Sequence, residues 1–117
     1  MKFMVSLITD GTSTQDATPE DRQEMGARMV EFMGELRSAD VLLHTDPLAP
    51  SASARTLRYG AHGRPVVTDG PFAESKEQIA GYMVLECADL DEAVAWAEKM
   101  PVRGGALEVR PIAEKPG

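Results

Sequence analysis

Residues 82–87 read Tyr-Met-Val-Leu-Glu-Cys, and residues 89–93 read Asp-Leu-Asp-Glu-Ala. The first segment carries apolar side chains on both of its alternating faces, which predicts a strand covered on both sides. In the second segment Asp89, with Glu92 three residues later, predicts the capping box that opens a helix. We therefore expect a strand followed directly by a helix, which ends after Met100 because Pro101 cannot continue it.

The N-terminal third repeats this order of strand and helix. Residues 2–9 are apolar and β-prone on both faces, and Asp10-Gly11 ends that strand. Thr18 and Pro19 have the residue types of a helix N-cap and first position. The helix is expected to reach about Ser38, and its apolar face follows i, i+4, i+7, i+8 and i+11 spacing. That face consists of Met25, Met29, Phe32, Met33 and Leu36.

Shorter strands are predicted at 41–44, 54–59, 64–68 and 106–112, with a break at 46–50. This order of elements favours an α+β fold, a ferredoxin-like split βαβ sandwich in which both helices cover one sheet face. We expect a single domain over 1–117. The opposite face would then expose Met4, Ile8, Tyr82 and Val84 in a monomer. Such a patch indicates an interface, and we predict a homodimer with sheets packed face to face.

Composition excludes several classes of function. The net charge is −7 and the pI is about 4.7, and the 12 basic residues are scattered, so neither nucleic acid nor an anionic membrane is an expected partner. The single cysteine, Cys87, allows no intrachain disulfide, which favours the cytoplasm, and its place in a strand predicts a buried inert thiol. Two histidines and one cysteine offer no metal-ligand spacing. We expect no metal and no cofactor, because no nucleotide-binding fingerprint is present either.

The segment Val66-Val67-Thr68-Asp69-Gly70-Pro71-Phe72-Ala73-Glu74-Ser75-Lys76-Glu77 is unusually dense in chemistry for a connector. With Ile79, Gly81-Tyr82, Asp89 to Ala93 and Gly104 to Pro111, it resembles the YCII-related superfamily and, within it, the DGPF-motif proteins. The resemblance covers nearly the whole chain. It implies a dimeric α+β barrel of ferredoxin-like protomers and a small cytoplasmic bacterial protein.

The same resemblance bears on activity. The family's activity is largely unassigned, and its members are often associated with extracytoplasmic-function sigma factors. Relatives are suspected of using an Asp–His pair, and a lyase that removes chloride from an aromatic ring looks similar. Many relatives carry His where this chain has Met29, and Gly where it has Asp40. The first difference removes half of the suspected pair.

The candidate catalytic residues are Asp69 and His44. Asp69 is either a carboxylate that takes a proton or the first residue of an Asx turn. His44, with Asp46 nearby, forms either a base with an orienting acid or an ordinary solvated histidine.

Four further residues are candidates for ligand binding. Lys76 holds an acidic ligand or belongs to a solvated charge cluster. Phe72 stacks on a ligand or anchors its loop in the core, and Tyr82 reaches a ligand or packs in the interface. Arg58 holds a carboxylate or ion-pairs with Glu86 or Glu108.

Three functions remain open from the sequence. The first is a small-molecule-binding or accessory homodimer with a sheet-face cavity lined by Met, Tyr and Val. The second is a cofactor-free lyase or isomerase acting on a small organic acid. The third is a regulatory partner of a sigma factor.

Overall fold

The computed structural model describes residues 1–11, 16–61, 63–73 and 75–115. Glu74 of the motif lies outside these ranges. In chain order the elements are β1 (Lys2–Thr9), α1 (Pro19–Ser38), β2 (Leu42–Pro47), the short 3₁₀ helix η1 (Ser51–Ser53), β3 (Arg55–Arg58), β4 (Val66–Asp69), β5 (Gln78–Glu86), α2 (Leu90–Glu98) and β6 (Ala106–Pro111).

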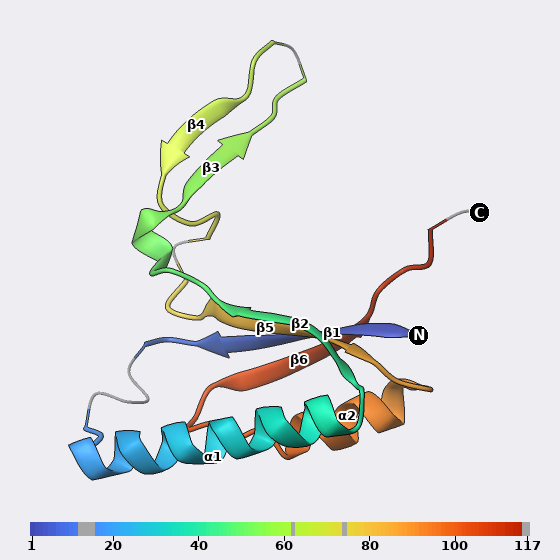
Figure 1. Ribbon diagram of the computed structural model, residues 1–117. Coiled ribbons are helices and arrows are strands. Elements are labelled where there is room, and N and C mark those ends of the chain that lie inside the picture. The colour runs from blue at the N-terminus through green and yellow to red at the C-terminus, as the bar shows by residue number, and fades with distance from the viewer. Residues whose placement is uncertain (12–15, 62, 74, 116–117) are drawn as a thin grey trace.

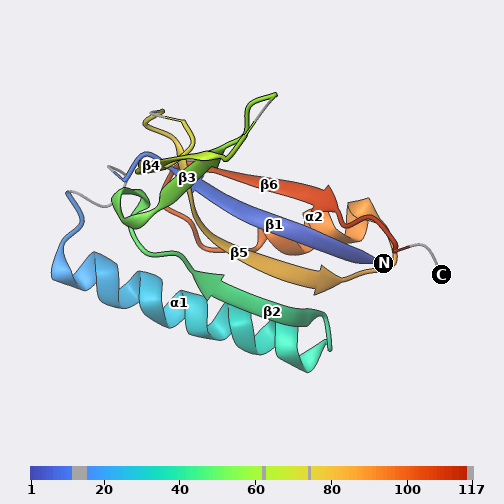
Figure 2. The same cartoon turned by 90° about the horizontal axis from the view of Figure 1, so that it is seen from above.

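Four of the strands form an antiparallel sheet in the order β2-β5-β1-β6. Both helices lie on one face of this sheet, as Figures 1 and 2 show. A sheet in this order with two crossover helices is the split βαβ arrangement. The prediction of an α+β, ferredoxin-like protomer is therefore confirmed. Strands β3 and β4 form a separate hairpin, inserted between β2 and β5.

The core lies between the sheet and the two helices. Phe3, Val5, Met83 and Leu85 alternate along the central strands β1 and β5 and are almost fully buried. Phe32 and Leu36 cover them from α1. From α2 the small residues Ala93 and Ala97 do the same, which lets that helix approach the sheet closely.

Both helices begin as the sequence predicts. The Thr18 hydroxyl accepts from the Asp21 N–H, and the Asp21 carboxylate accepts from the Thr18 N–H, both at 3.0 Å. Asp89 caps α2 by accepting from the Glu92 N–H at 2.9 Å. The Glu92 carboxylate, however, accepts from the Ala88 N–H instead of from the cap residue itself.

Several expected boundaries were wrong. Strand β5 begins at Gln78 and not at Tyr82, because Ile79 and Gln78 continue the pairing with β1 beyond a bulge. Strand β2 runs through Asp46 to Pro47, where the sequence indicated a break. Pro47 is tolerated because β2 is an edge strand, where a missing N–H costs no ladder hydrogen bond. Helix α2 ends at Glu98, two residues before Met100.

The predicted apolar face of α2 is only half correct. Ala93 and Ala97 are buried, whereas Leu90 and Val94 are exposed and Trp96 is partly buried. The Lys99 ammonium lies 4.8 Å from the centre of the Trp96 ring. Neither helix in the described part of the chain combines the length and the apolar character needed to cross a membrane.

The sheet face opposite the helices is not covered by any described element (Figure 1). Met4 on β1 pairs with Val84 on β5, and this pair is one residue along from the buried pair of Val5 and Met83. Alternation therefore places Met4 and Val84 on this open face, together with Tyr82 and Ile8. Met4 is exposed and the other three are partly buried. The homodimer expected from this patch stays a prediction.

Gly105 is required where the chain turns into β6. Its φ is +82°, and a Cβ there would lie 2.3 Å from the Ile8 carbonyl oxygen. We expect Gly105→Ala to lower the free energy of unfolding by at least about 2 kcal/mol, because it combines a left-handed backbone with a backbone clash. The matched control is Gly26→Ala in α1, where a Cβ meets nothing within 4 Å. That change should stabilise by up to about 1 kcal/mol. Urea denaturation compares the two, and equal midpoints would contradict this role of Gly105.

Candidate functional site: an apolar cavity beneath helix α1

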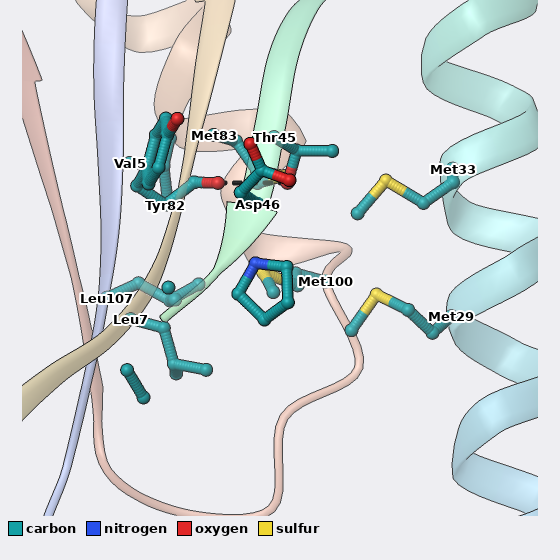
Figure 3. Close-up of a pocket in the computed structure, with 13 residues that line it drawn as sticks. Val5, Leu7, Met29, Met33, Thr45, Asp46, Tyr82, Met83, Met100 and Leu107 are labelled. Atoms are coloured by element: carbon teal, nitrogen blue, oxygen red, sulfur yellow. Dashed lines mark hydrogen bonds between the residues drawn. The ribbon is translucent and has the colours of Figure 1, made fainter. Parts of the chain in front are cut away.

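An apolar hollow with a volume of about 310 Å³ lies between α1 and the sheet. We call it the methionine cavity, because Met29, Met33, Met83 and Met100 line it. Figure 3 shows Met29 and Met33 facing it from α1, across from Leu7 and Leu107 on the sheet. The other lining residues are Val5, Thr45, Asp46, Pro47, Ala80, Gly81 and Tyr82. The sequence predicted a sheet-face cavity lined by Met, Tyr and Val; the methionine cavity has all three residue types in its lining and lies on the helix side of the sheet.

Small residues on the sheet and long ones on the helix create this space. Gly81 is paired with Leu7 and Pro47, so it occupies a helix-facing position but has no side chain to fill it. A Cβ there would lie 3.3 Å from the Asp46 carbonyl oxygen. Helix α1 packs tightly only in its second half, through Phe32 and Leu36. Met29 and Met33 are partly buried and border the space that is left.

A second hollow, of about 280 Å³, adjoins the first toward the start of α1. The two share Leu7, Met29 and Met100 as lining residues, and Met25 extends the methionine lining along the helix. Arg103 lies at this end and pairs with the Asp21 carboxylate at 3.1 Å. The hydrogen bond from the Thr18 backbone N–H, and then Arg103, holds the pKa of Asp21 below its usual value.

The polar groups nearest the methionine cavity lie at the edge strand β2. The Thr45 hydroxyl donates to the Tyr82 carbonyl oxygen at 2.9 Å (Figure 3). His44 Nε2 and Asp46 Oδ2 are 2.8 Å apart, and the His44 ring stacks on Tyr82 with centroids separated by 5.6 Å. His44 and Asp46 are two residues apart, so they share the open face, while Thr45 points toward the helices. The side chains of the His44–Asp46–Tyr82 cluster thus lie on the open face, and the methionines lie on the helix face. Asp46 and Tyr82 nevertheless also belong to the cavity lining.

Asp69 is placed elsewhere, in the β3–β4 hairpin. Its side chain is 92% exposed and pairs with Arg55 at 3.5 Å. The predicted Asx turn is wrong, since Pro71, two residues on, has no N–H to donate to the carboxylate. Gly70, with φ +97°, makes the turn, and its N–H donates to the Ala54 carbonyl oxygen at 2.7 Å. The structure does not bring Asp69 and His44 together within one chain.

Arg58 and Phe72 interact with each other. The Arg58 guanidinium donates to the Phe72 carbonyl oxygen at 2.7 Å and to the Thr68 hydroxyl at 3.0 Å, and it lies over the Phe72 ring. Arg58 therefore secures the loop after β4 instead of pairing with Glu86 or Glu108. Phe72 is 68% exposed, so the expectation that it anchors the loop in the core is wrong.

Lys76 borders a third hollow, of about 300 Å³, at the root of the hairpin. Its walls come from the end of β1, from the region of η1 and from the loop before β5. The Gln78 side chain shapes that loop by donating to the Ala73 and Ser75 carbonyl oxygens, at 2.8 and 2.7 Å. Lys76 and Tyr82, both predicted to bind ligand, thus lie at different hollows.

Two further kinds of group bear on chemistry, namely the single cysteine and possible metal ligands. Cys87 is buried, and desolvation raises the pKa of its thiol, as expected for an inert cysteine. Within the described ranges, no three His, Cys, Asp or Glu side chains gather as a metal ion would require.

Sequence reasoning found Tyr82, His44 and Asp46 but did not predict that the methionines of α1 line the cavity. A signal was present: Met25, Met29 and Met33 recur at i, i+4 and i+8 on one face of α1. That pattern predicts core packing equally well, because methionines that fill a core and methionines that line a cavity recur at the same helical spacing.

The family follows from comparison of the sequence. The YCII-related domain family matches residues 1–115. This chain belongs to that family. An uncharacterized protein of Rhizobium meliloti (strain 1021) is 47% identical to the YCII-related chain over 121 residues, which cover 100% of this chain and 97% of the relative. Whether the chain falls in the DGPF-motif group stays a prediction.

A solved structure shows the same fold. It is 5-chloro-2-hydroxyhydroquinone dehydrochlorinase from Burkholderia phenoliruptrix AC1100, in complex with 2,5-dihydroxybenzoquinone. The alignment covers 98% of this YCII-related chain and 96% of the other, with a TM-score of 0.53 and 16% sequence identity. At that identity the likeness concerns the fold alone.

Proposed function

We propose that this YCII-related protein is a homodimer that binds a small, largely apolar organic molecule in the methionine cavity. The observation that carries the proposal is an apolar hollow of about 310 Å³, bordered by polar groups of Thr45, Asp46 and Tyr82. Ligand sites occupy roughly 300–1,000 Å³ and combine apolar walls with few polar groups. The size therefore suits a compound of about one ring. The cytoplasmic location stays a prediction that rests on the lone cysteine.

Methionine suits such a site because its thioether is flexible and polarisable and adapts to ligands of different shape. Met29 has a particular place here. It lines the cavity at the position where the family resemblance leads one to expect histidine. Replacing a titratable ring with a thioether changes the cavity wall from a proton-transfer group to an apolar contact, which favours binding over acid–base chemistry at this position.

The proposal predicts that a thermal-shift panel of one-ring phenols, quinones and aromatic acids contains ligands. We would include 2,5-dihydroxybenzoquinone, the compound bound by the dehydrochlorinase. A compound present at 100 times its Kd should stabilise the folded protein by about 2.7 kcal/mol. Met29→Trp should raise the Kd of any hit about tenfold or more, because the indole occupies the cavity.

The matched control is Val30→Trp, one residue along α1, where the side chain is 74% exposed. This variant should bind with unchanged Kd. A blank panel, or equal Kd values for the two variants, would contradict binding in the methionine cavity.

A second candidate is the cofactor-free lyase or isomerase. The observation that favours it is the His44–Asp46 hydrogen bond of 2.8 Å beside Tyr82. A carboxylate on one ring nitrogen fixes the tautomer and leaves the other nitrogen as a base. Here Asp46 takes the orienting role that the sequence suggested for it, and Asp69, the other acid–base candidate, lies in the separate hairpin. The third hypothesis, a regulatory partner of a sigma factor, stays a prediction.

This candidate predicts that a bound organic acid in D₂O exchanges a carbon-bound proton for deuterium. ¹H NMR would measure the rate of this exchange. His44→Gln should slow the exchange at least about a hundredfold while binding persists, since a positioned base contributes 10²–10⁴-fold. Asp69→Asn should leave it unchanged. Full exchange in His44→Gln would exclude His44 as the base, and loss of exchange in Asp69→Asn would restore the pair predicted from sequence.

A further inference from the structure

The β3–β4 hairpin, residues 55–61 and 63–69, pairs with no other strand of the described chain, and we call it the arm. It has its own two-stranded sheet and rises from the end of β2, on the side of the main sheet opposite the helices (Figure 1). An isolated two-stranded hairpin is at best marginally stable in water. The arm therefore requires a surface to pack against.

Alternation along the two strands gives the arm two different faces. One face has an apolar centre with the Arg55–Asp69 ion pair at its base, and the other is polar except for Val66. Leu57 is paired with Val67, and Tyr59 continues the same alternation beyond β3. The opposite face carries Thr56, Arg58 and Thr68, which hydrogen-bond to one another or to the loop that follows β4. Tyr59 is 75% exposed, and Leu57 and Val67 are exposed as well. The polar side chains of both faces thus have partners within the hairpin and its loop, whereas the apolar side chains of Leu57, Tyr59 and Val67 remain exposed.

The accessible surface area of the chain indicates how much surface a partner would cover. The accessible surface is 8550 Å², whereas a compact chain of this mass exposes about 6,200 Å². The radius of gyration is 16.8 Å, against about 13 Å for a compact domain of this length. The excess of about 2,300 Å² falls in the range that each subunit of an obligate dimer buries, about 1,000–2,500 Å².

We propose that the arm is an intersubunit clasp, whose apolar face of Leu57, Tyr59 and Val67 packs against a second copy of this chain. The inference rests on the proposed homodimer. The arm rises on the same side as the open sheet face, so a second sheet stacked on that face lies beside the arm. A two-fold axis then gives the partner's arm the same environment, and both apolar surfaces of each chain are covered by one partner.

The first test is photo-crosslinking. Benzoylphenylalanine placed at Tyr59 should produce a covalent dimer on irradiation, with crosslinked peptides from the partner. The control is the same group at Val30, which is 74% exposed on α1, on the helix side of the sheet. It should produce no covalent dimer. Crosslinks from Val30 and none from Tyr59 would overturn the proposal.

The second test compares two neighbouring valines by sedimentation equilibrium. Val67→Asp places a charge on the apolar face and should raise the dimer dissociation constant at least tenfold. Val66→Asp makes the same change on the other face, at a position that is 63% exposed against 56% for Val67. It should alter the constant less than twofold.

The outcomes separate the clasp from the homodimer. A wild-type dimer that Val67→Asp leaves intact overturns the clasp while the homodimer stands. A wild-type chain that sediments as a monomer overturns both. Circular dichroism of each variant confirms that the main sheet remains folded, so that loss of the dimer is not caused by unfolding.

Discussion

Packing of both helices on one face of a four-stranded sheet is the constraint on which the rest of this structure depends. The buried side chains Phe3, Val5, Met83 and Leu85 alternate along β1 and β5, so each of their neighbours in sequence is directed to the other face. That alternation fills the core and leaves the opposite face open. The core and the open face are thus consequences of the same strand pairing.

The methionine cavity arises where this packing is incomplete. Phe32 and Leu36 hold the second half of α1 on the sheet, while Met29 faces Gly81 and the small residues near it across a space. A Cβ at Gly81 would lie 3.3 Å from the Asp46 carbonyl oxygen, so the absence of a side chain there also lets β2 lie close to β5. All of the lining residues except Met100 lie on α1 or on a strand of the main sheet, so the packing of these elements forms the cavity.

The sequence predicted the fold well because its signals are local. The side chains of Thr18 and Asp89 cap the two helices by accepting from backbone N–H groups three residues along the chain. Alternation along residues 82–87 likewise needs no knowledge of the rest of the chain. The start of β5 at Gln78 was missed because it depends on a bulge in the pairing with β1. Pro47 was misassigned because an edge strand cannot be told from a break by sequence alone.

The candidate site was less predictable, because it depends on which distant segments meet. Asp69 and His44 were grouped by residue chemistry, but the hairpin carries Asp69 into a separate sheet. Arg58 and Phe72 were separate candidates for ligand binding, and their contact with each other was not foreseen. The methionines were interpreted as core, and only the placement of α1 over Gly81 shows that they border a hollow.

The most direct measurement uses the methionines themselves as reporters. Of the seven methionines in the chain, five border the two adjoining hollows beneath α1, namely Met25, Met29, Met33, Met83 and Met100. With ¹³C-methyl labels, titration of a compound found by thermal shift should move the signals of Met29, Met33, Met83 and Met100, while the signal of Met1 stays unchanged. Movement confined to Met4 on the open face, or no movement of the cavity methionines, would contradict binding in the methionine cavity.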